Sequence, residues 1–240
     1  MLDFGYMGKM IDSLSVFFPT YNEEKNIRGI VLSAKKILQT VAKKWEIIIV
    51  NDGSSDGTQE VAKKLIEGDG RIRIVTHKVN KGYGSALKSG FKKAKYNWVA
   101  FADSDGQFDF SEIKKFLPLT DRYDLILGYR LKRADSLSRK IGAAVWAFIP
   151  QVLWGMKVRD YSCGFKLIKK KVFDAVQPLI GEEKVTQIEL LVKAKGKGFK
   201  IAEVGVHHYP RRFGKPTGAK TKVILKSVVD IFRLWQKLGK

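Results

Sequence analysis

The sequence predicts an α/β fold in which a mostly parallel sheet is covered by helices on both faces. Three observations support this. Short β-rich runs alternate with helical patterns over the first 128 residues, most of the runs are apolar enough to be buried, and a polar motif follows several of them. Such alternation is typical of parallel strands joined by crossover helices. Ligands of these folds bind beyond the carboxyl ends of the strands.

The first two strand–helix pairs are predicted from apolar runs that are followed by amphipathic spacing. Leu14–Phe18 is a β-rich run, and Glu24–Ala42 carries apolar residues at intervals that place them on one helical face. Glu46–Val50 has the apolar character of a buried strand. The next helix, from about Asp56 to Glu67, has Ser55 or Asp56 available as its cap.

The same alternation continues to residue 128. Ile72–Thr76 is predicted as the third strand and Tyr83–Ala94 as the third helix. Trp98–Ala102 is an uninterrupted apolar run and is predicted as the fourth strand. A short helix at Ser111–Leu117 then leads to a fifth strand at Asp124–Leu127.

Two further apolar helices are expected later in the chain. Ile141–Met156 is the longest mostly apolar stretch, and its 16 residues fall short of the roughly 20 that span a bilayer. Lys222–Leu238 has an apolar stripe flanked by lysine and arginine, which predicts either a membrane-surface anchor or docking on the core. The stripe consists of Ile224, Leu225, Val228, Ile231, Phe232, Trp235 and Leu238.

Charge and cysteine content narrow the class of protein. The formal net charge is +21, and residues 121–240 carry 26 lysines and arginines against 10 aspartates and glutamates. Such a surface attracts phosphate-rich partners, either an anionic membrane or nucleic acid. Cys163 is the only cysteine, which excludes an internal disulfide and suits a reducing compartment. Residues 1–13 show no secretory signal, so we expect a soluble or peripheral protein.

The segment after the fourth predicted strand carries the strongest chemical signal. Asp103 and Asp105 lie one residue apart at the end of a buried run, with Gln107 close behind. Carboxylate and amide oxygens are the ligands that Mg²⁺ or Mn²⁺ would take from this loop. A cation held there is suited to bridging a diphosphate, which points to a nucleotide-activated substrate. The alternative is an ordinary turn with solvated aspartates.

Polar motifs also follow the first two strands. After the first, Tyr21 could stack on a base and Glu23 could accept its hydrogen bonds, although a helix start capped by Asn22 explains the same residues. After the second, Asp52 could hold a base or ribose. The glycines of that second motif, Gly53 and Gly57, would permit positive φ in a tight turn.

The motif after the third strand is rich in small residues. It reads Asn-Lys-Gly-Tyr-Gly-Ser-Ala over residues 80–86. This spacing matches neither a Walker A loop nor a Rossmann dinucleotide fingerprint. We therefore expect a close approach of backbone to backbone, or of backbone to a ligand.

In order and spacing, the four motifs resemble those of the family 2 glycosyltransferases, and more closely the polyprenyl-phosphate sugar transferases such as the dolichyl-phosphate mannose synthases. They match as Pro-x-Tyr-Asn-Glu, Asn-Asp-Gly-Ser-x-Asp-Gly-Thr, Asn-x-Gly-x-Gly-x-Ala and Asp-x-Asp-Gly-Gln. The resemblance implies the GT-A fold, which is a Rossmann-like sheet with helices on both faces. It also implies a nucleotide site formed by Pro19, Tyr21, Glu23, Val50 and Asp52, with Asp103 on the donor or the metal and Asp105 and Gln107 on the metal.

The second half of the chain matches this family less closely. The resemblance assigns Arg130, Arg139 and Arg211 to the catalytic machinery, where they would meet the acceptor phosphate. It also matches the stretch Asp160–Leu167, which reads Asp-x-x-Cys-Gly-Phe-Lys-Leu. After Arg211 the family continues with Ser-Lys, whereas this chain has Lys-Pro-Thr at residues 215–217. That departure leaves the lipid and the sugar open.

The resemblance implies one GT-A domain over residues 1–217, with a nucleotide-sugar half at 14–130 and an acceptor half at 131–217. Residues 218–240 would form the basic amphipathic helix. The implied reaction is inverting transfer of a hexose, mannose or glucose, from GDP-mannose or UDP-glucose to a polyprenyl phosphate. The implied location is the cytoplasmic face of an anionic membrane, where the protein is peripheral or attached to an integral partner.

Two other functions compete with this prediction. A transferase of the same fold could act on a sugar hydroxyl, a reaction that usually needs a general base, for which Asp160 is the best candidate. The net charge also fits a nucleic-acid-binding protein. However, the positive charge lies mainly in the half without nucleotide motifs, so no nucleic-acid partner is expected.

Overall fold

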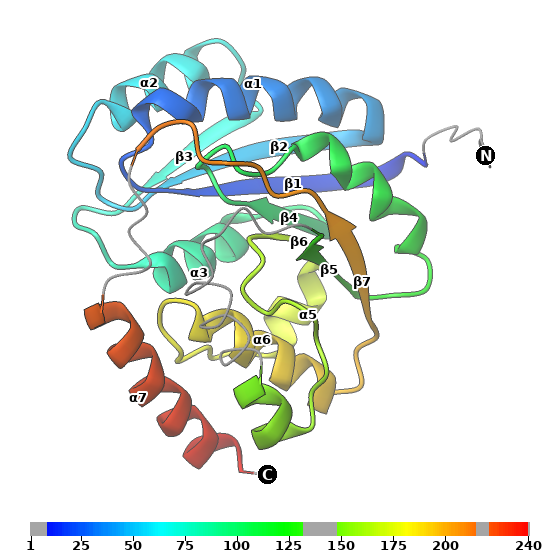
Figure 1. Ribbon diagram of the computed structural model, residues 1–240. Coiled ribbons are helices and arrows are strands. Elements are labelled where there is room, and N and C mark those ends of the chain that lie inside the picture. The colour runs from blue at the N-terminus through cyan, green and yellow to red at the C-terminus, as the bar shows by residue number, and fades with distance from the viewer. Residues whose placement is uncertain (1–8, 132–147, 215–220, 240) are drawn as a thin grey trace.

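A computed structural model describes residues 9–131, 148–214 and 221–239. Within this part, seven strands form one sheet in the order β3-β2-β1-β4-β6-β5-β7 (Figure 1). The strands are β1 (Ile11–Thr20), β2 (Ala42–Asn51), β3 (Ile72–Thr76), β4 (Trp98–Ala102), β5 (Leu125–Arg130), β6 (Phe165–Lys169) and β7 (Ile201–Val206).

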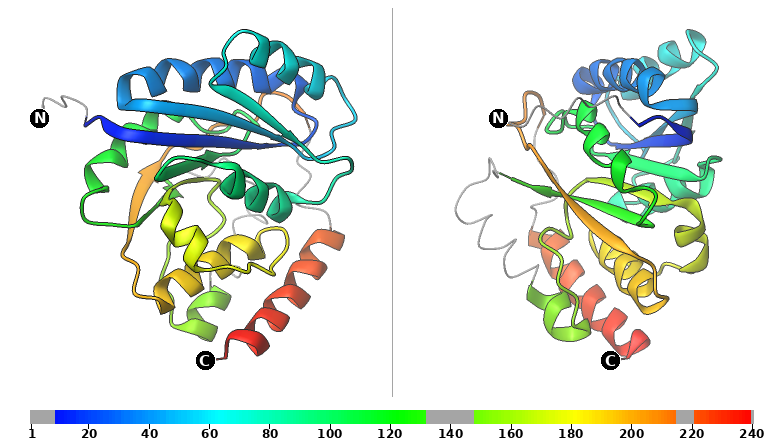
Figure 2. Two further views of the ribbon diagram at one scale, coloured as in Figure 1. Left: turned by 180° about the vertical axis from the view of Figure 1, so that it is seen from behind. Right: turned by 90° about the vertical axis from the view of Figure 1, so that its right-hand side faces the viewer.

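The described helices connect these strands and cover both faces of the sheet. They are α1 (Glu24–Val41), α2 (Thr58–Glu67), α3 (Tyr83–Lys93), α5 (Lys170–Ala175), α6 (Val185–Gly196) and α7 (Thr221–Leu238), with 3-10 turns η1 (Phe110–Lys115) and η2 (Leu117–Leu119). Residues 148–154 are also helical. Figure 2 shows α1 and α2 on one face and α3, α5 and α6 on the other.

The predicted parallel sheet is confirmed for the first four strands and needs one correction. Strands β1, β2, β3 and β4 are mutually parallel. β6 is antiparallel to both of its neighbours, β4 and β5, whereas β5 and β7 are parallel to each other. The first, second and fifth strands also differ in length from the prediction. The segment predicted as a helix at Ser111–Leu117 forms the 3-10 turns η1 and η2.

Two apolar cores explain why these segments form strands. Along β1, Val16 and Phe18 face the core under α1, while Phe17 faces the core under α3. β2 alternates in the same way. Because both faces of β1 and β2 are buried, these strands contain apolar runs that could be recognised in the sequence, although both strands extend beyond the predicted bounds.

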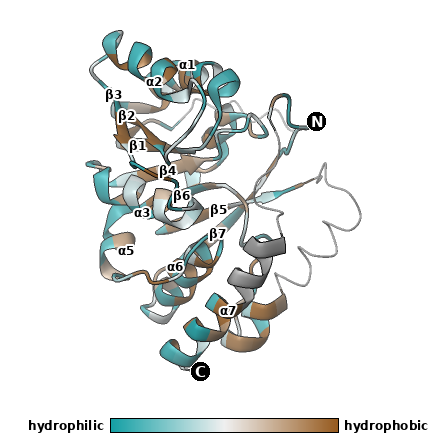
Figure 3. Ribbon diagram, turned by 90° about the vertical axis from the view of Figure 1, so that its left-hand side faces the viewer, coloured by the Kyte–Doolittle hydropathy of each residue, from teal (hydrophilic) through white to brown (hydrophobic). Residues whose placement is uncertain are grey.

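Helix α7 forms as predicted, and its described apolar side chains divide between core and solvent. Ile231 and Leu234 are 5% and 1% exposed and belong to the core that also contacts residues 148–154. Val229 and Phe232 are 48% and 54% exposed. Figure 3 shows apolar colouring on α7 and on the neighbouring short helix. Among the described helices, none is both long and apolar enough to cross a membrane.

Candidate active site

The predicted site residues meet at the carboxyl ends of β1, β2 and β4. These strands are parallel neighbours, so their following loops share one edge of the sheet. The Ser104 hydroxyl donates to the carbonyl oxygen of Pro19 at 2.6 Å and ties the aspartate loop to the end of β1. The loop that carries Asp103 and Asp105 is thereby held beside the motif of Tyr21 and Glu23.

Asp103 is fixed by a residue from another motif. The Tyr83 hydroxyl, at the start of α3, donates to Asp103 Oδ1 at 2.7 Å. Burial, with a further contribution from Asp103, raises the pKa of Tyr83 well above its usual value, so the phenol remains a donor. On the other side, a Cβ atom at Gly164 would collide with the Asp103 carboxylate. Glycine is therefore needed at position 164, within the Cys-Gly-Phe motif, because the Asp103 carboxylate leaves no room for a side chain.

Asp105 lies in a partly buried and acidic environment. Burial, and after it the neighbouring charge of Asp103, raises the pKa of Asp105 to about 7. The backbone N–H of Gln107 donates to Asp105 Oδ1 at 3.1 Å. The Gln107 side-chain amide donates to the carbonyl oxygen of Tyr209 at 2.9 Å, which brings the segment after β7 onto this loop.

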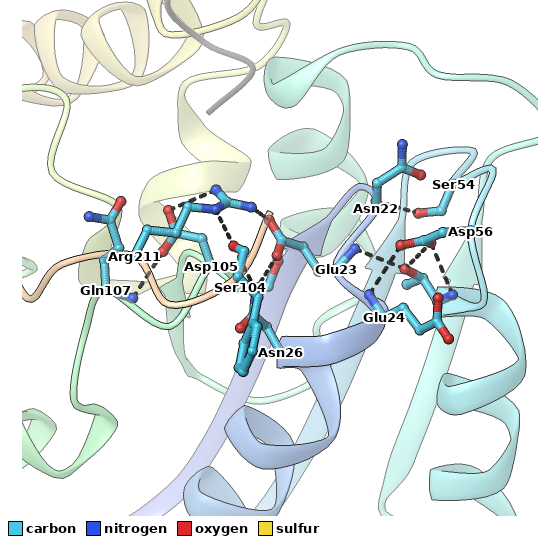
Figure 4. Close-up of polar contacts among 12 residues, drawn as sticks. Asn22, Glu23, Glu24, Asn26, Ser54, Asp56, Ser104, Asp105, Gln107 and Arg211 are labelled. Carbon is cyan, nitrogen blue, oxygen red and sulfur yellow. Dashed lines mark hydrogen bonds and ion pairs between the residues drawn. The ribbon is translucent and has the colours of Figure 1, made fainter. Parts of the chain in front are cut away.

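Arg211 joins the first and last motifs of the site (Figure 4). Its guanidinium forms an ion pair with Glu23 and lies 3.5 Å from Asp105 Oδ2. Glu23 also accepts a hydrogen bond from the Asn26 side chain at 2.6 Å. Burial raises the pKa of Glu23, opposed by Asn26 and Arg211. The structure thus brings together Glu23, Asp105 and Arg211, which lie far apart in the sequence.

The oxygen donors in this loop suit a hard divalent cation. Among the described residues, no cluster of three or more His, Cys, Asp or Glu side chains could hold a metal. Two carboxylates alone fit Mg²⁺ or Mn²⁺, because such ions keep several waters or take phosphate oxygens from a substrate. Burial, and after it the charge of Asp103, raises the pKa of Asp105, and Arg211 opposes this shift. Asp103 and Asp105, with the amide oxygen of Gln107, are the residues that would hold it.

Asp52 lies in a second polar cluster at the end of β2. It is 3% exposed and accepts hydrogen bonds from the backbone N–H groups of Lys81 and Gly82, both at 2.9 Å. His77 Nδ1 lies 2.6 Å from Asp52 Oδ1, and His77 Nε2 lies 2.8 Å from the Ser89 hydroxyl. An ionised carboxylate has about four acceptor positions, so a ligand group can still be accommodated.

The other residues assigned to the nucleotide occupy different environments. Pro19 is buried at the end of β1, and Tyr21 is partly exposed just beyond it. Val50 is fully buried and packs in the core under α3, so its side chain is unavailable to a ligand.

Two local expectations at the strand ends were wrong. The N-cap of α1 is Glu23, not Asn22, whose side chain accepts a hydrogen bond from the backbone N–H of Ser55. Gly53 has the expected positive φ, at 68°, whereas Gly57 has φ of −70°. Next to Gly57 lies the flexible carboxylate end of the exposed Glu24 side chain, which accepts a hydrogen bond from the Gly57 backbone N–H at 3.2 Å.

The small residues of the third motif confirm the expected close approach of backbones. A Cβ atom at Gly84 would lie within 2.8 Å of the backbone nitrogen of Glu183. Gly82 has φ of 88° and meets the Glu183 side chain in the same way. The start of α3 is therefore packed directly against the loop that precedes α6.

Arg130 lies at the end of β5 and is held by Asp160. Arg130 Nε and one terminal nitrogen donate to the two oxygens of Asp160 at 2.7 and 2.9 Å, and the same nitrogen donates to the Ser162 hydroxyl at 2.9 Å. Arg139 lies outside the described residues. So do residues 215–217, which depart from the family pattern.

His77 and Tyr83 contact predicted site residues, and neither was singled out from the sequence. His77 directly follows β3, the position at which the predicted motifs follow their strands, so this placement was a usable signal. Tyr83 stood within the small-residue motif, but its contact with Asp103 depends on how α3 docks and has no local signature.

A family model described as glycosyl transferase family 2 matches residues 15–177. The chain belongs to glycosyl transferase family 2. The matched region contains Glu23, Asp52, Asp103, Asp105 and Arg130, and ends before Arg211.

Curated relatives and solved structures agree with this family. The chain is 28% identical over 206 residues to the undecaprenyl-phosphate 4-deoxy-4-formamido-L-arabinose transferases of two strains, Salmonella choleraesuis (strain SC-B67) and Salmonella newport (strain SL254). The match covers 85% of this chain and 62% of each relative, so this family 2 chain spans less than two thirds of their length.

Solved structures confirm the GT-A fold. Glucosyl-3-phosphoglycerate synthase from Mycobacterium tuberculosis, in complex with Mn²⁺, UDP and glucosyl-3-phosphoglycerate, superposes with a TM-score of 0.70 at 18% identity. The alignment covers 94% of this chain and 80% of that one. The same enzyme with Mg²⁺ and UDP gives a TM-score of 0.71 at 16% identity, with the same coverage.

Proposed function

We propose that this family 2 protein is an inverting glycosyltransferase that moves a sugar from a nucleotide-sugar donor to a polyprenyl phosphate. The donor would lie across the ends of β1, β2 and β4, with its nucleoside near Asp52 and its diphosphate near Asp103 and Asp105. The similarity to undecaprenyl-phosphate transferases supports the acceptor class. The expected sugar is still a hexose, either mannose carried by GDP or glucose carried by UDP.

The ion pair of Arg130 with Asp160 is the observation that carries the choice of acceptor. Transfer to a sugar hydroxyl would need a general base, and Asp160 was the best candidate. Both of its carboxylate oxygens accept hydrogen bonds from Arg130, and the pair is largely buried. A carboxylate whose two oxygens both accept hydrogen bonds from a guanidinium is a poor proton acceptor. A phosphomonoester needs no base, because it is already anionic at neutral pH.

The proposed step balances without a protein nucleophile. An acceptor phosphate oxygen attacks the anomeric carbon, and the bond from that carbon to the diphosphate breaks and releases the nucleoside diphosphate. Arg211, together with Arg139 from the family resemblance, would offset the charge of the approaching phosphate, whereas the charge of Arg130 is already largely offset by Asp160. A Mg²⁺ or Mn²⁺ ion held by Asp103, Asp105 and Gln107 would stabilise the leaving diphosphate.

We also propose that the protein acts at the cytoplasmic surface of an anionic membrane. Val229 and Phe232 of α7 are exposed, as are Phe148 and Val152 of the short helix, and Arg233 is 70% exposed on α7. Apolar side chains bordered by cations bind an anionic lipid surface. Attachment to an integral membrane partner is the alternative, and residues 218–240 are the segment that would make it.

The activity test uses the full chain with labelled GDP-mannose, UDP-glucose or a nucleotide-activated 4-deoxy-4-formamido-arabinose, in the presence of Mn²⁺. Each donor is paired with a polyprenyl phosphate and, separately, with the corresponding free polyprenol and a glycan. Label should move to the lipid phosphate alone, and removing Mn²⁺ with a chelator should stop the transfer. Transfer to the glycan with no transfer to polyprenyl phosphate would overturn the acceptor proposal.

A further inference from the structure

Three consecutive residues at the start of α3 contact both of the carboxylates to which the proposed function assigns the donor. The backbone N–H groups of Lys81 and Gly82 donate to Asp52, and the Tyr83 hydroxyl donates to Asp103. Asp52 follows β2 and Asp103 follows β4, and β1 lies between these strands in the sheet. The segment therefore crosses the end of β1 and links the two ends of the proposed donor pocket.

This link is held firmly on both sides. A Cβ atom at Gly53 would collide with the backbone of Val79 and Asn80, which are the residues just before the link. On the opposite side, Gly82 and Gly84 lie against Glu183 and its neighbours in the loop before α6. Packing of backbone against backbone leaves little room for one end of the link to move independently of the other.

The Asp52 end has an additional support. His77 lies between the Asp52 carboxylate and the Ser89 hydroxyl, at 2.6 and 2.8 Å, and its side chain is 9% exposed. Ser89 belongs to α3, the helix that starts at Tyr83. The same helix thus orients Asp52 through His77 and Asp103 through Tyr83.

We propose that Tyr83 is a positioning residue for Asp103 and that the segment Lys81–Tyr83 couples the nucleoside end of the donor pocket to its cation end. The inference rests on the proposed function. The Tyr83 hydroxyl holds Asp103 Oδ1 and thereby selects one orientation of the carboxylate, which packs against Gly164 on its other side. Removal of the hydroxyl should lower the affinity for a divalent cation and reduce the cation's contribution to diphosphate binding. The contacts of Asp52 should remain unchanged.

The test is calorimetric titration of the full chain with UDP and with GDP, each in the presence and absence of Mn²⁺. The ratio of the two dissociation constants for one nucleotide is the coupling factor. Tyr83→Phe should reduce this factor about tenfold, in the range expected for the loss of one hydrogen bond to a charged group. Affinity for the nucleotide without Mn²⁺ should stay within about twofold of the wild-type value.

Tyr96→Phe is the matched control, because it removes a phenol hydroxyl from the turn before β4, at the opposite end of the sheet. It should leave the coupling factor unchanged. In turnover assays, Tyr83→Phe should raise the Mn²⁺ concentration needed for half-maximal rate and recover nearly full kcat at saturating Mn²⁺. A purely structural defect would lower kcat at all Mn²⁺ concentrations and would overturn the positioning role.

The other end of the link gives the reciprocal test. His77→Ala should weaken binding of the nucleotide without Mn²⁺ and leave the affinity for Mn²⁺ alone unchanged. A wild-type coupling factor in Tyr83→Phe would overturn the inference and leave the proposed function standing. If the wild-type chain bound neither nucleotide, with or without Mn²⁺, the proposed function itself would fail.

Discussion

Arg211 and Glu23 form an ion pair across 188 positions of the sequence. The pair draws the segment after β7 onto the start of α1, and the guanidinium also lies 3.5 Å from Asp105. In this structure, one cation offsets two carboxylates at the centre of the proposed donor pocket. A metal ion bound at Asp105 would compete for this contact and would leave the guanidinium available to the acceptor phosphate, so Arg211 is the residue whose substitution should be most informative.

Substitution of Arg211 by alanine should weaken binding of the acceptor more than binding of the donor. We expect the KM for polyprenyl phosphate to rise at least tenfold, and the KM for the nucleotide sugar to change much less. Arg211→Lys should restore the acceptor KM only in part, because an ammonium lacks the bidentate fork. Initial-rate kinetics measure both constants. Arg212→Ala is the matched control, since Arg212 is the exposed neighbour. Equal loss in both variants would contradict the role of Arg211.

Asp105→Asn should remove most of the turnover, by about a hundredfold or more, without destabilising the fold. The amide would remove the repulsion between Asp103 and Asp105, and this repulsion contributes to the raised pKa of Asp105. Turnover is measured in saturating Mg²⁺ and Mn²⁺, and the unfolding midpoint is measured by circular dichroism. Asp109→Asn is the control, because asparagine can replace Asp109 as the cap of η1. Near wild-type turnover in Asp105→Asn would exclude it as a metal ligand.

Phe232→Ser should weaken binding to anionic liposomes while leaving stability nearly unchanged, because Phe232 is exposed on α7. Leu234→Ser, on the buried face of the same helix, should instead destabilise the fold by about 3 kcal/mol. Sedimentation with vesicles that contain anionic lipid measures the binding. Salt should weaken it as the Debye length falls below about 10 Å. If Phe232→Ser bound as tightly as the wild type, the exposed face would not be the membrane surface.

Asp69 should make the free energy of unfolding of the wild type depend more strongly on acidic pH than that of Asp69→Asn. Hydrogen bonds from Arg71, and the nearby Lys35, hold the pKa of Asp69 well below its usual value of 3.8. A carboxylate with a lowered folded-state pKa contributes stability above pH 3.8 that is lost as the pH falls further. Asp69→Asn should therefore be less stable than the wild type at pH 7, and the difference should shrink below pH 4.

Urea midpoints at pH 7, 5, 4 and 3 measure this dependence. Asp12→Asn is the comparison: the Lys43 partner also lowers the pKa of Asp12, but the carboxyl is 89% exposed. Its smaller effect should disappear in salt, because exposed pairs are screened. Parallel profiles for Asp69→Asn and the wild type would refute the role of Asp69.

β1, β2 and β4 were predictable because most of their residues are buried on both faces and form apolar runs, whereas the edge strand β3 is only partly buried and was predicted from its β-branched residues. β6 has no such signature, since two of its five residues are Lys166 and Lys169. The Lys166 side chain is 1% exposed, and its ammonium donates to the carbonyl oxygens of Tyr161 and Cys163 and to the Gln187 side chain. A buried lysine depends on partners that only the tertiary structure brings together, and so does the pairing of β6 with β4.

The candidate site was predictable where its residues directly follow strands. Asp52 and Asp103 were found in this way, because the ends of parallel strands converge. The contacts of Arg211 with Glu23 and of Tyr83 with Asp103 could not be predicted from spacing, because they join elements through docking. The resemblance marked Arg211 for the acceptor, and the structure adds the carboxylates that hold it.

The antiparallel strand β6 has a consequence for how the chain can be divided. It lies between β4 and β5, so the strands of the nucleotide half are not contiguous in the sheet. A fragment cut after residue 131 would leave β4 with a bare edge and β5 with neither of its neighbours, β6 and β7. Bare edges invite aggregation. We therefore expect the half that would bind the nucleotide to need β6 for a complete sheet, although β6 lies outside it in the sequence.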